Sequence, residues 1–181
     1  LHVLRLDPAD ARAHNRDDQP HEVWRSLDRA LRWAKDLWDS EESTRLIIHP
    51  GTYTNLLDFQ DHHYRTRTPA LLVLEASESG RVLFDAAAAT NRAYLLGSKT
   101  RHVVLRGLSF TNAQAGLPLV SLRRCGNLLF DRCSGLTPDS VRLEGCDSIT
   151  FRACGFDTAE RFLAPALSNR NIRVESASNA P

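Results

Sequence analysis

Short alternating apolar segments recur through the second half of the chain, between positions 101 and 175. Each segment places two apolar residues two positions apart, with a polar or variable residue between most of them. The four pairs are Val103 and Leu105, Leu128 and Phe130, Ile149 and Phe151, and Ile172 and Val174. Because side chains alternate between the two faces of a strand, this pattern predicts four strands that each bury one face.

The segments recur at a nearly constant period. The first apolar residues of the four pairs, at positions 103, 128, 149 and 172, are 25, 21 and 23 residues apart. A second alternating pair also recurs after 21 residues, as Val120 with Leu122 and then Val141 with Leu143. A period of about 20 to 50 residues is typical of stacked repeats, in which no unit buries its apolar face alone. We therefore expect three short strands per repeat, joined by turns.

Two repeat architectures have periods in this range. A leucine-rich repeat needs room for a helix or an extended return segment. Residues 134–140, which connect two of the strands, contain Gly and Pro and show no helical apolar spacing. A parallel β-helix therefore fits the repeat better than a leucine-rich repeat.

An amphipathic helix is expected over about residues 20 to 39. Its apolar residues fall on one stripe at helical spacing, with Arg, Asp and Lys on the other side, and Pro20 suits a first helical turn. The stripe consists of Val23, Leu27, Ala30, Leu31, Ala34, Leu37 and Trp38. A helix laid across the open end of a β-helix would cover its unpaired backbone groups and apolar core.

The order of these N-terminal elements resembles a known family. A short strand at 2–6 precedes the helix, which contains the sequence SLDRAL at 26–31, and a strand then closes on HPGTY at 49–53. This order resembles the N-terminal cap of pectate-lyase-like right-handed β-helix proteins, and residues 103–112 are similar to a coil motif of that superfamily. The resemblance covers nearly the whole chain. It implies an all-β solenoid, a right-handed parallel β-helix with an N-terminal amphipathic capping helix.

One domain is expected over residues 1–181. The N-terminal strand and capping helix take up 1–43, the coils 44–177 and a tail 178–181. With 181 residues, of which 42% are hydrophobic, the chain can bury a sizeable core. No run approaches the about 18 apolar residues of a membrane span, so we expect no membrane insertion.

The net charge and the first residue of the chain lead to expectations about the protein's binding partners and its location in the cell. The net charge is +1, from 23 basic and 22 acidic residues, and aromatic residues are not interleaved with basic clusters. We therefore expect no nucleic-acid partner. The sequence begins at Leu1 and contains no Met, so we expect a processed or trimmed product. The family it resembles is usually exported, which implies a secreted or periplasmic protein whose signal sequence has been removed.

Four cysteines recur with the repeat. Cys125 precedes Cys146 by 21 residues, and Cys133 precedes Cys154 by the same interval. Each pair should therefore stack in adjacent coils, at the about 4.8 Å spacing of neighbouring strands. A ladder of buried thiols is the first interpretation, and disulfides between coils are the second. A metal site is the third, although the repeats that carry the cysteines contain no His to complete a tetrahedral set.

One charged position recurs three residues after the first apolar residue of each repeat. It holds Arg106, Asp131, Arg152 and Glu175, so the sign of the charge alternates along the stack. The simplest interpretation is ion pairing from one strand to the next. The resemblance suggests another role, because lyases of this fold use an Arg or Lys to remove a proton alpha to a uronate carboxylate, with acidic residues holding calcium.

An irregular segment at 58–67 is the candidate ligand-binding region. It shows no clear period and collects His, acidic, Arg and aromatic side chains, as functional loops on rigid scaffolds do. The candidate binding residues are Asp61, His62, His63, Tyr64, Arg65 and Arg67. A solvated excursion of the chain is the alternative. We expect no metal site at His62 and His63, since neighbours on an extended chain point apart.

Catalytic residues are not assigned by the sequence. It contains no nucleophile elbow, Walker, zinc-protease or dinucleotide motif. Five carboxylates could supply an acid and a base, but no spacing singles two of them out: Asp85, Asp131, Asp139, Asp147 and Asp157. No cofactor is expected, and calcium is implied by the resemblance alone.

Two functions follow from different classes. The first is a secreted domain that binds or processes polysaccharide, as a lyase, a glycoside hydrolase or a fragment of one. The second is a noncatalytic structural or assembly subunit that docks a protein partner, or a second copy of itself, through an open C-terminal coil. The second rests on the final strand at 171–175, which is followed by Ser-Ala-Ser-Asn-Ala-Pro and no capping helix.

Overall fold

The computed structural model describes the seven ranges 1–10, 23–60, 69–89, 92–113, 115–156, 158–163 and 168–176. Within these ranges the protein is mostly β and contains an eight-, a four- and a three-stranded sheet. Every strand pair between neighbours in these sheets is parallel. Parallel neighbours need a connection that returns to the same end, and here the other two sheets provide it.

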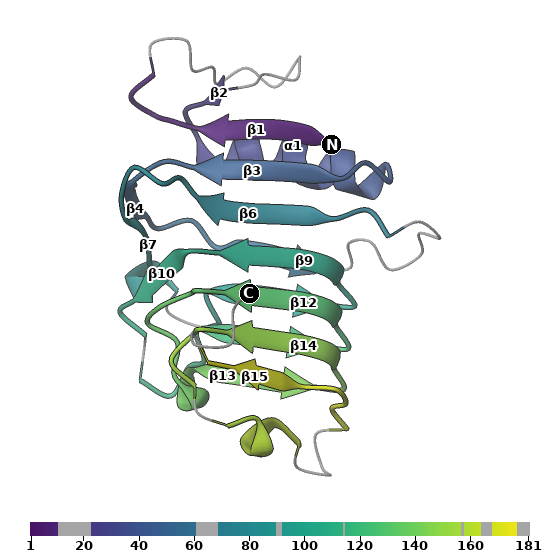
Figure 1. Cartoon of the computed structure of the whole chain (residues 1–181). Helices are drawn as coiled ribbons and strands as arrows, with labels where there is room; N and C mark the ends of the chain where they lie inside the picture. The colour runs from purple at the N-terminus through teal and green to yellow at the C-terminus, as the bar shows by residue number, and fades with distance from the viewer. Residues whose placement is uncertain are drawn as a thin grey trace.

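The chain visits the three sheets in rotation. Sheet A, in the front of Figure 1, has the order β15-β14-β12-β9-β6-β3-β1-β2, sheet B the order β10-β7-β4 and sheet C the order β13-β11-β8-β5. Each passage through sheets A, B and C is called a circuit below. The first circuit is β3 (Thr44–Ile48), β4 (Gly51–Tyr53) and β5 (Leu57–Gln60). The second is β6 (Leu72–Ala76), β7 (Val82–Asp85) with the 3-10 turn η1 (Ala86–Ala88), and β8 (Leu95–Ser98).

Later circuits repeat this order with shorter connections. The third circuit is β9 (Arg101–Arg106), β10 (Leu108–Thr111) and β11 (Val120–Arg123). The fourth is β12 (Gly126–Asp131), a bridge from Ser134 to Ser109 in sheet B, the turn η2 (Pro138–Ser140) and β13 (Val141–Glu144). The fifth begins with β14 (Asp147–Arg152) and includes the turn η3 (Glu160–Leu163), and β15 (Arg173–Glu175) follows it in sheet A. The predicted three strands per repeat are therefore present in the first three circuits.

The register confirms the repeat alignment expected from the sequence. Leu128 pairs with Val103 on one side and with Ile149 on the other, and Phe130 likewise pairs with Leu105 and Phe151. All six side chains are buried. Parallel in-register pairing places equivalent residues directly above one another, so each repeated apolar position becomes a column in the core.

Left-handed backbone recurs at the corners of the circuits. One corner column, with positive φ, consists of Lys99, Arg124, Gly145 and Ser168, and a second consists of His102, Asn127, Ser148 and Asn171. A third consists of Gly107, Arg132 and Ala153. Most of these residues are not glycine, although a left-handed conformation costs an ordinary residue about 1 to 2 kcal/mol. Main-chain hydrogen bonds to the neighbouring circuits hold the corners, such as Arg132 N to Arg152 O at 2.7 Å.

The N-terminal elements cover one end of the stack. Strand β1 (His2–Leu6) pairs with β3 and with the short β2 (Val23–Trp24), and α1 (Leu27–Asp39) lies behind β1 and β3 in Figure 1. The helix buries Leu27, Ala30, Leu31, Ala34 and Trp38, as the predicted stripe requires, with Leu37 packed at its border. Indole Nε1 of Trp38 donates to the carbonyl of Ala70 at 3.1 Å, which ties the helix to the start of the second circuit.

One predicted boundary at this end is wrong. Val23 belongs to β2 and not to the helix, which begins after Ser26. Val23 fits the helical spacing of the apolar stripe, so the sequence pattern did not show this break. The strand that begins at Thr44 ends at Ile48, and the chain then turns at His49 and Pro50 from sheet A into sheet B, where β4 begins at Gly51.

The opposite end of the core is not bare. Phe156 and Phe162 are buried, and the Phe162 ring lies 5.6 Å from that of Phe151, with which it stacks. Phe151 in turn stacks on Phe130 at 4.9 Å. The turn η3 therefore covers the aromatic column of the last circuit, although the sequence shows no capping helix after the final strand. Strand β15 is still the edge of sheet A.

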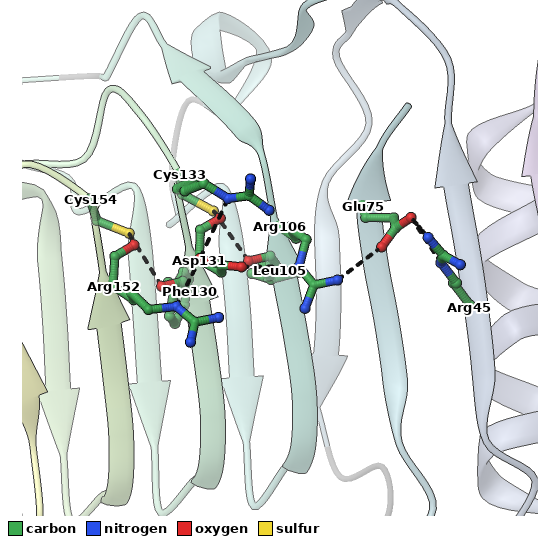
Figure 2. Close-up of polar contacts among 10 residues, drawn as sticks. Arg45, Glu75, Leu105, Arg106, Phe130, Asp131, Cys133, Arg152 and Cys154 are labelled. Carbon is green, nitrogen blue, oxygen red and sulfur yellow. Dashed lines mark hydrogen bonds and ion pairs between the residues drawn. The ribbon is translucent and has the colours of Figure 1, made fainter. Parts of the chain in front are cut away.

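The cysteines are free and buried, in the stacked arrangement expected of a thiol ladder. Cys133 Sγ donates to the carbonyl of Leu105 at 3.4 Å, and Cys154 Sγ donates to that of Phe130 at 3.3 Å (Figure 2). A hydrogen bond with Cys154 and burial together raise the pKa of Cys133 well above its ordinary value. The same hydrogen bond lowers the pKa of Cys154, its partner in the column. All four thiols are buried, and burial makes them small core residues.

Replacing Phe151 with Ala should lower the free energy of unfolding by about 3 to 5 kcal/mol, because it opens a cavity between two stacked rings. Urea denaturation followed by circular dichroism measures the change. Leu163→Ala is the control, since Leu163 lies in the adjacent turn but is 45% exposed. Equal losses from both substitutions would contradict the stacked core.

Candidate functional site

A ladder of charged side chains crosses the outer face of sheet A. Glu75, Arg106, Asp131, Arg152 and Glu175 occupy paired positions on β6, β9, β12, β14 and β15. The four positions predicted to align are therefore in register, and Glu75 extends the alternation by one strand. Position 75 escaped notice in the sequence because the second circuit was not part of the recognised repeat.

Direct contacts connect most of this ladder (Figure 2). Arg106 Nε donates to Asp131 Oδ2 at 3.0 Å, and Arg152 Nε donates to Asp131 Oδ1 at 3.0 Å. Arg106 also lies 3.4 Å from Glu75 Oε2. On β3, Ile47 is opposite Glu75, and Arg45 precedes Ile47 by two residues. Arg45 Nε donates to Glu75 Oε1 at 2.8 Å. The predicted pairing between strands is confirmed for these members.

The two carboxylates are far less exposed than the arginines around them. The side chains of Glu75 and Asp131 are 8% and 6% exposed, whereas that of Arg106 is 38% exposed. Burial acts to raise the pKa of Asp131, but hydrogen bonds from Arg152 and Arg106 and the charges of Arg152 and Arg132 outweigh it. The net effect lowers the pKa of Asp131, so it is a stable counter-ion for the arginines.

This arrangement bears on the catalytic interpretation of the ladder. A lyase needs a basic side chain that can take a proton from its substrate. Arg106 and Arg152 each donate to Asp131, and the pKa of Arg152 is raised further, chiefly by that hydrogen bond. A guanidinium held protonated in this way is unsuited to accept a proton. The ladder is better explained as a structural element of the face.

A hollow of about 520 Å³ opens on the same face beside the last rungs of the ladder. We call it the polar hollow. Its polar lining residues come from three neighbouring strands and their corners: Asn127, Ser148, Thr150, Arg152, Asn171, Arg173 and Glu175. Asn127, Ser148 and Asn171 are the left-handed corner column described above. The backbone corner thus brings one amide or hydroxyl per circuit to the same side of the hollow.

A smaller hollow of about 220 Å³ adjoins the polar hollow through Asn127. We call it the basic hollow, because Lys99, Arg101 and Arg124 line it with a single carboxylate, that of Asp147. Asp147 Oδ1 accepts a hydrogen bond from Asn171 Nδ2 at 2.8 Å, which joins the linings of the two hollows. Together the hollows form a continuous polar surface with an excess of positive charge.

The sequence carries a signal for this surface. Asn or Ser stands at positions 127, 148 and 171, directly before the last three of the four apolar pairs and at the repeat period. Small polar residues such as Asn tolerate the left-handed conformation of these corners. Their recurrence at the repeat period indicates a column of short polar side chains.

The predicted binding residues are not placed. Asp61, His62, His63, Tyr64, Arg65 and Arg67 all lie outside the described residues. The start of that segment was misjudged, because residues 57–60 form β5 and Phe59 is buried. Tyr53 and His49, which stand nearby in sequence, are in contact: the Tyr53 hydroxyl donates to the His49 carbonyl at 2.8 Å.

The candidate acid and base carboxylates serve different local contacts. Asp85 accepts from Ala87 N at 2.9 Å and from Asn112 at 2.9 Å, and so caps the turn η1. Asp131 belongs to the ladder and Asp147 to the hollow linings, while Asp157 lies outside the described residues. Among the described residues, no three His, Cys, Asp or Glu gather as a metal-binding group. Calcium therefore stays an implication of the family resemblance.

The described helix and turns include none that is long and apolar enough to cross a bilayer. The chain matches no protein-family model, no curated protein and no solved structure. The functional assignment therefore rests on the geometry of this chain.

Asp131→Asn should lower the free energy of unfolding at pH 7 by about 1.5 to 3 kcal/mol, because hydrogen bonds between charged groups are lost. The folded-state pKa of Asp131 is lowered, so its contribution is complete above the ordinary Asp pKa of about 3.9 and fades as the pH falls through the folded-state value. Unfolding curves from pH 7 to pH 2 should show the two proteins converging.

Glu144→Gln is the matched control for this experiment. Glu144 pairs with Arg123 at 3.5 Å, but both side chains are more than half exposed. Such pairs contribute about 0 to 1 kcal/mol, so this variant should stay close to the parent protein at every pH. An Asp131→Asn variant as stable as Glu144→Gln would contradict the role given to the ladder.

Proposed function

We propose that the protein is a secreted right-handed parallel β-helix of the pectate-lyase-like kind, and that it binds polysaccharide on the outer face of sheet A. The rotation of the chain through three parallel sheets and the helix over one end support the fold. The resemblance of the N-terminal cap supports the kinship and the export. The polar hollow is the observation that carries the binding function.

The hollow has the chemistry that sugar hydroxyls require. A side-chain amide and a hydroxyl can each both donate and accept hydrogen bonds. Asn127, Asn171 and Thr150 can therefore hydrogen-bond to the adjacent hydroxyls of a sugar ring. Arg173 and Glu175 add a charged donor and a charged acceptor on β15. Equivalent residues recur with each circuit, which matches the repeating units of a polymer.

The basic hollow favours an acidic sugar at one end of the site. Arg101 and Arg124 present planar guanidinium groups, which bind carboxylates through paired hydrogen bonds. An oligosaccharide that extends from the polar hollow past Asn127 would bring a uronate carboxylate to this cluster. We therefore propose acidic oligosaccharides as the preferred ligands, with neutral ones binding more weakly.

Arg173→Ala should weaken binding of a uronate oligosaccharide by about tenfold, the effect of losing one charged hydrogen bond of about 1.5 kcal/mol. An oligosaccharide array followed by calorimetry on the best ligand measures it. Arg142→Ala is the control, because Arg142 is equally an exposed strand arginine but lies on β13 in sheet C. Equal affinities for the two variants would exclude the polar hollow. Absorbance for unsaturated products in the same samples tests cleavage.

A second function is favoured by a separate observation at the C-terminal end. Strand β15 is the edge of sheet A, and Leu163 in the adjoining turn η3 is 45% exposed. An edge strand presents unpaired backbone groups to which another strand can add. A protein partner or a second copy could therefore dock here, as a noncatalytic assembly subunit would require.

Leu163→Glu should abolish association through this end, because it places a charge on the exposed apolar residue of the contact. Sedimentation velocity across a range of concentrations measures self-association. Leu71→Glu is the control, since Leu71 is 37% exposed near the opposite end. A parent protein that stays monomeric, and pulls down no strand-adding partner, would contradict the docking function while leaving glycan binding untouched.

A further inference from the structure

Three chemically distinct residues occupy one position on adjacent strands near the N-terminal end. Asp7, His49 and Ser77 each directly follow a strand of sheet A, namely β1, β3 and β6. These strands pair in register, with Leu6 opposite Ile48 and Ile48 opposite Ala76. Main-chain hydrogen bonds continue the ladder through the three residues, from His49 N to Leu6 O at 2.9 Å and from Ser77 N to Ile48 O at 2.8 Å.

The histidine lies between the acid and the serine in this stack. Asp7 Oδ2 is 3.2 Å from His49 Nδ1. A carboxylate on Nδ1 selects the tautomer in which Nε2 carries the lone pair. Strand β3 lies between β1 and β6, so Ser77 stands on the side of His49 away from Asp7, about one strand spacing of 4.8 Å along the stack.

A hollow gives small molecules access to this position. It has a volume of about 340 Å³, and its polar lining residues are Arg5, Arg45, His49, Glu75, Ser77, Glu78 and Ser79. The side chain of His49 is 31% exposed, so the imidazole is reachable from solvent but partly shielded. The Ser77 hydroxyl is 2.8 Å from that of Ser79. This hollow lies at the opposite end of sheet A from the polar hollow.

We propose that Ser77, His49 and Asp7 form a hydrolytic site for small acyl esters. In the first step Ser77 Oγ attacks the ester carbonyl carbon, and His49 Nε2 takes the hydroxyl proton. The intermediate collapses by breaking the bond to the alcohol, which leaves with the proton from His49. Water then attacks the acyl-serine with His49 again as base, and the acid leaves as Ser77 regains its proton.

Each residue has a separate role in this sequence. Ser77 and His49 contact the reacting atoms and are the catalytic residues. Asp7 acts through His49 and is a positioning residue. Arg5 and Arg45 line the same hollow with the carboxylates of Glu75 and Glu78, and Arg45 is paired with Glu75. This activity goes beyond glycan binding and does not depend on it.

A fluorophosphonate probe on the intact protein tests the site. It should label the parent protein at Ser77, as located by peptide mass spectrometry. Labelling should be lost in Ser77→Ala and in His49→Gln, and it should be unchanged in Ser121→Ala, a strand serine of sheet C. Thermal melting confirms that each variant is folded. A parent protein that is not labelled, or is labelled at Ser79 instead, would overturn the proposal.

Hydrolysis of p-nitrophenyl acetate separates catalysis from a structural role. Ser77→Ala should lower the rate at least about 100-fold, because the nucleophile is lost. Asp7→Asn should lower kcat and leave KM for the ester unchanged, because Asp7 orients the imidazole and does not contact the substrate. An unchanged kcat in Asp7→Asn, or full activity in Ser77→Ala, would overturn the assignment.

Discussion

In-register pairing of parallel strands is the constraint on which the rest of this structure depends. Each circuit hydrogen-bonds to the next with equivalent residues opposite one another, as Leu128 is opposite Val103 and Ile149. A residue type repeated at the period therefore becomes a column about 4.8 Å in spacing. The stacked rings of Phe130 and Phe151, the two thiol columns and the left-handed corners all follow from this one geometric fact.

The same constraint explains the charge ladder on the outer face. Side chains of equal position are forced together, so a column of like charges would repel along its whole length. Because the sign of the charge alternates, neighbouring side chains attract each other instead. Asp131 accepts hydrogen bonds from Arg106 on one neighbouring strand and from Arg152 on the other. The ladder therefore fixes register as well as charge, because a slip of one residue on any strand would remove a counter-ion from a buried carboxylate.

The two proposed sites lie at columns whose side chains are polar instead of apolar. The polar hollow arises where a corner column of Asn127, Ser148 and Asn171 presents hydrogen-bonding groups to solvent. The proposed hydrolytic site arises where a column changes chemistry at every rung, from Asp7 to His49 to Ser77. The backbone holds the three groups on adjacent strands, and Asp7 contacts His49 directly, whereas the Ser77 hydroxyl contacts Ser79.

The sequence by itself determined the repeat, the columns of the core and the alternation of charge from position 106 onward. The repeat period and the apolar alternation can be read directly from the order of residues along the chain. It also located the amphipathic helix. Only the tertiary structure decided the rest: that Val23 leaves the helix for β2, that Glu75 joins the ladder and that Phe162 covers the last rings. The column of Asp7, His49 and Ser77 was equally hidden, since its members are 42 and 28 residues apart and no fixed period connects them. Contacts of this kind depend on the lengths of the irregular connections between strands. These connections differ in length from circuit to circuit, so no sequence period aligns the residues that they bring together.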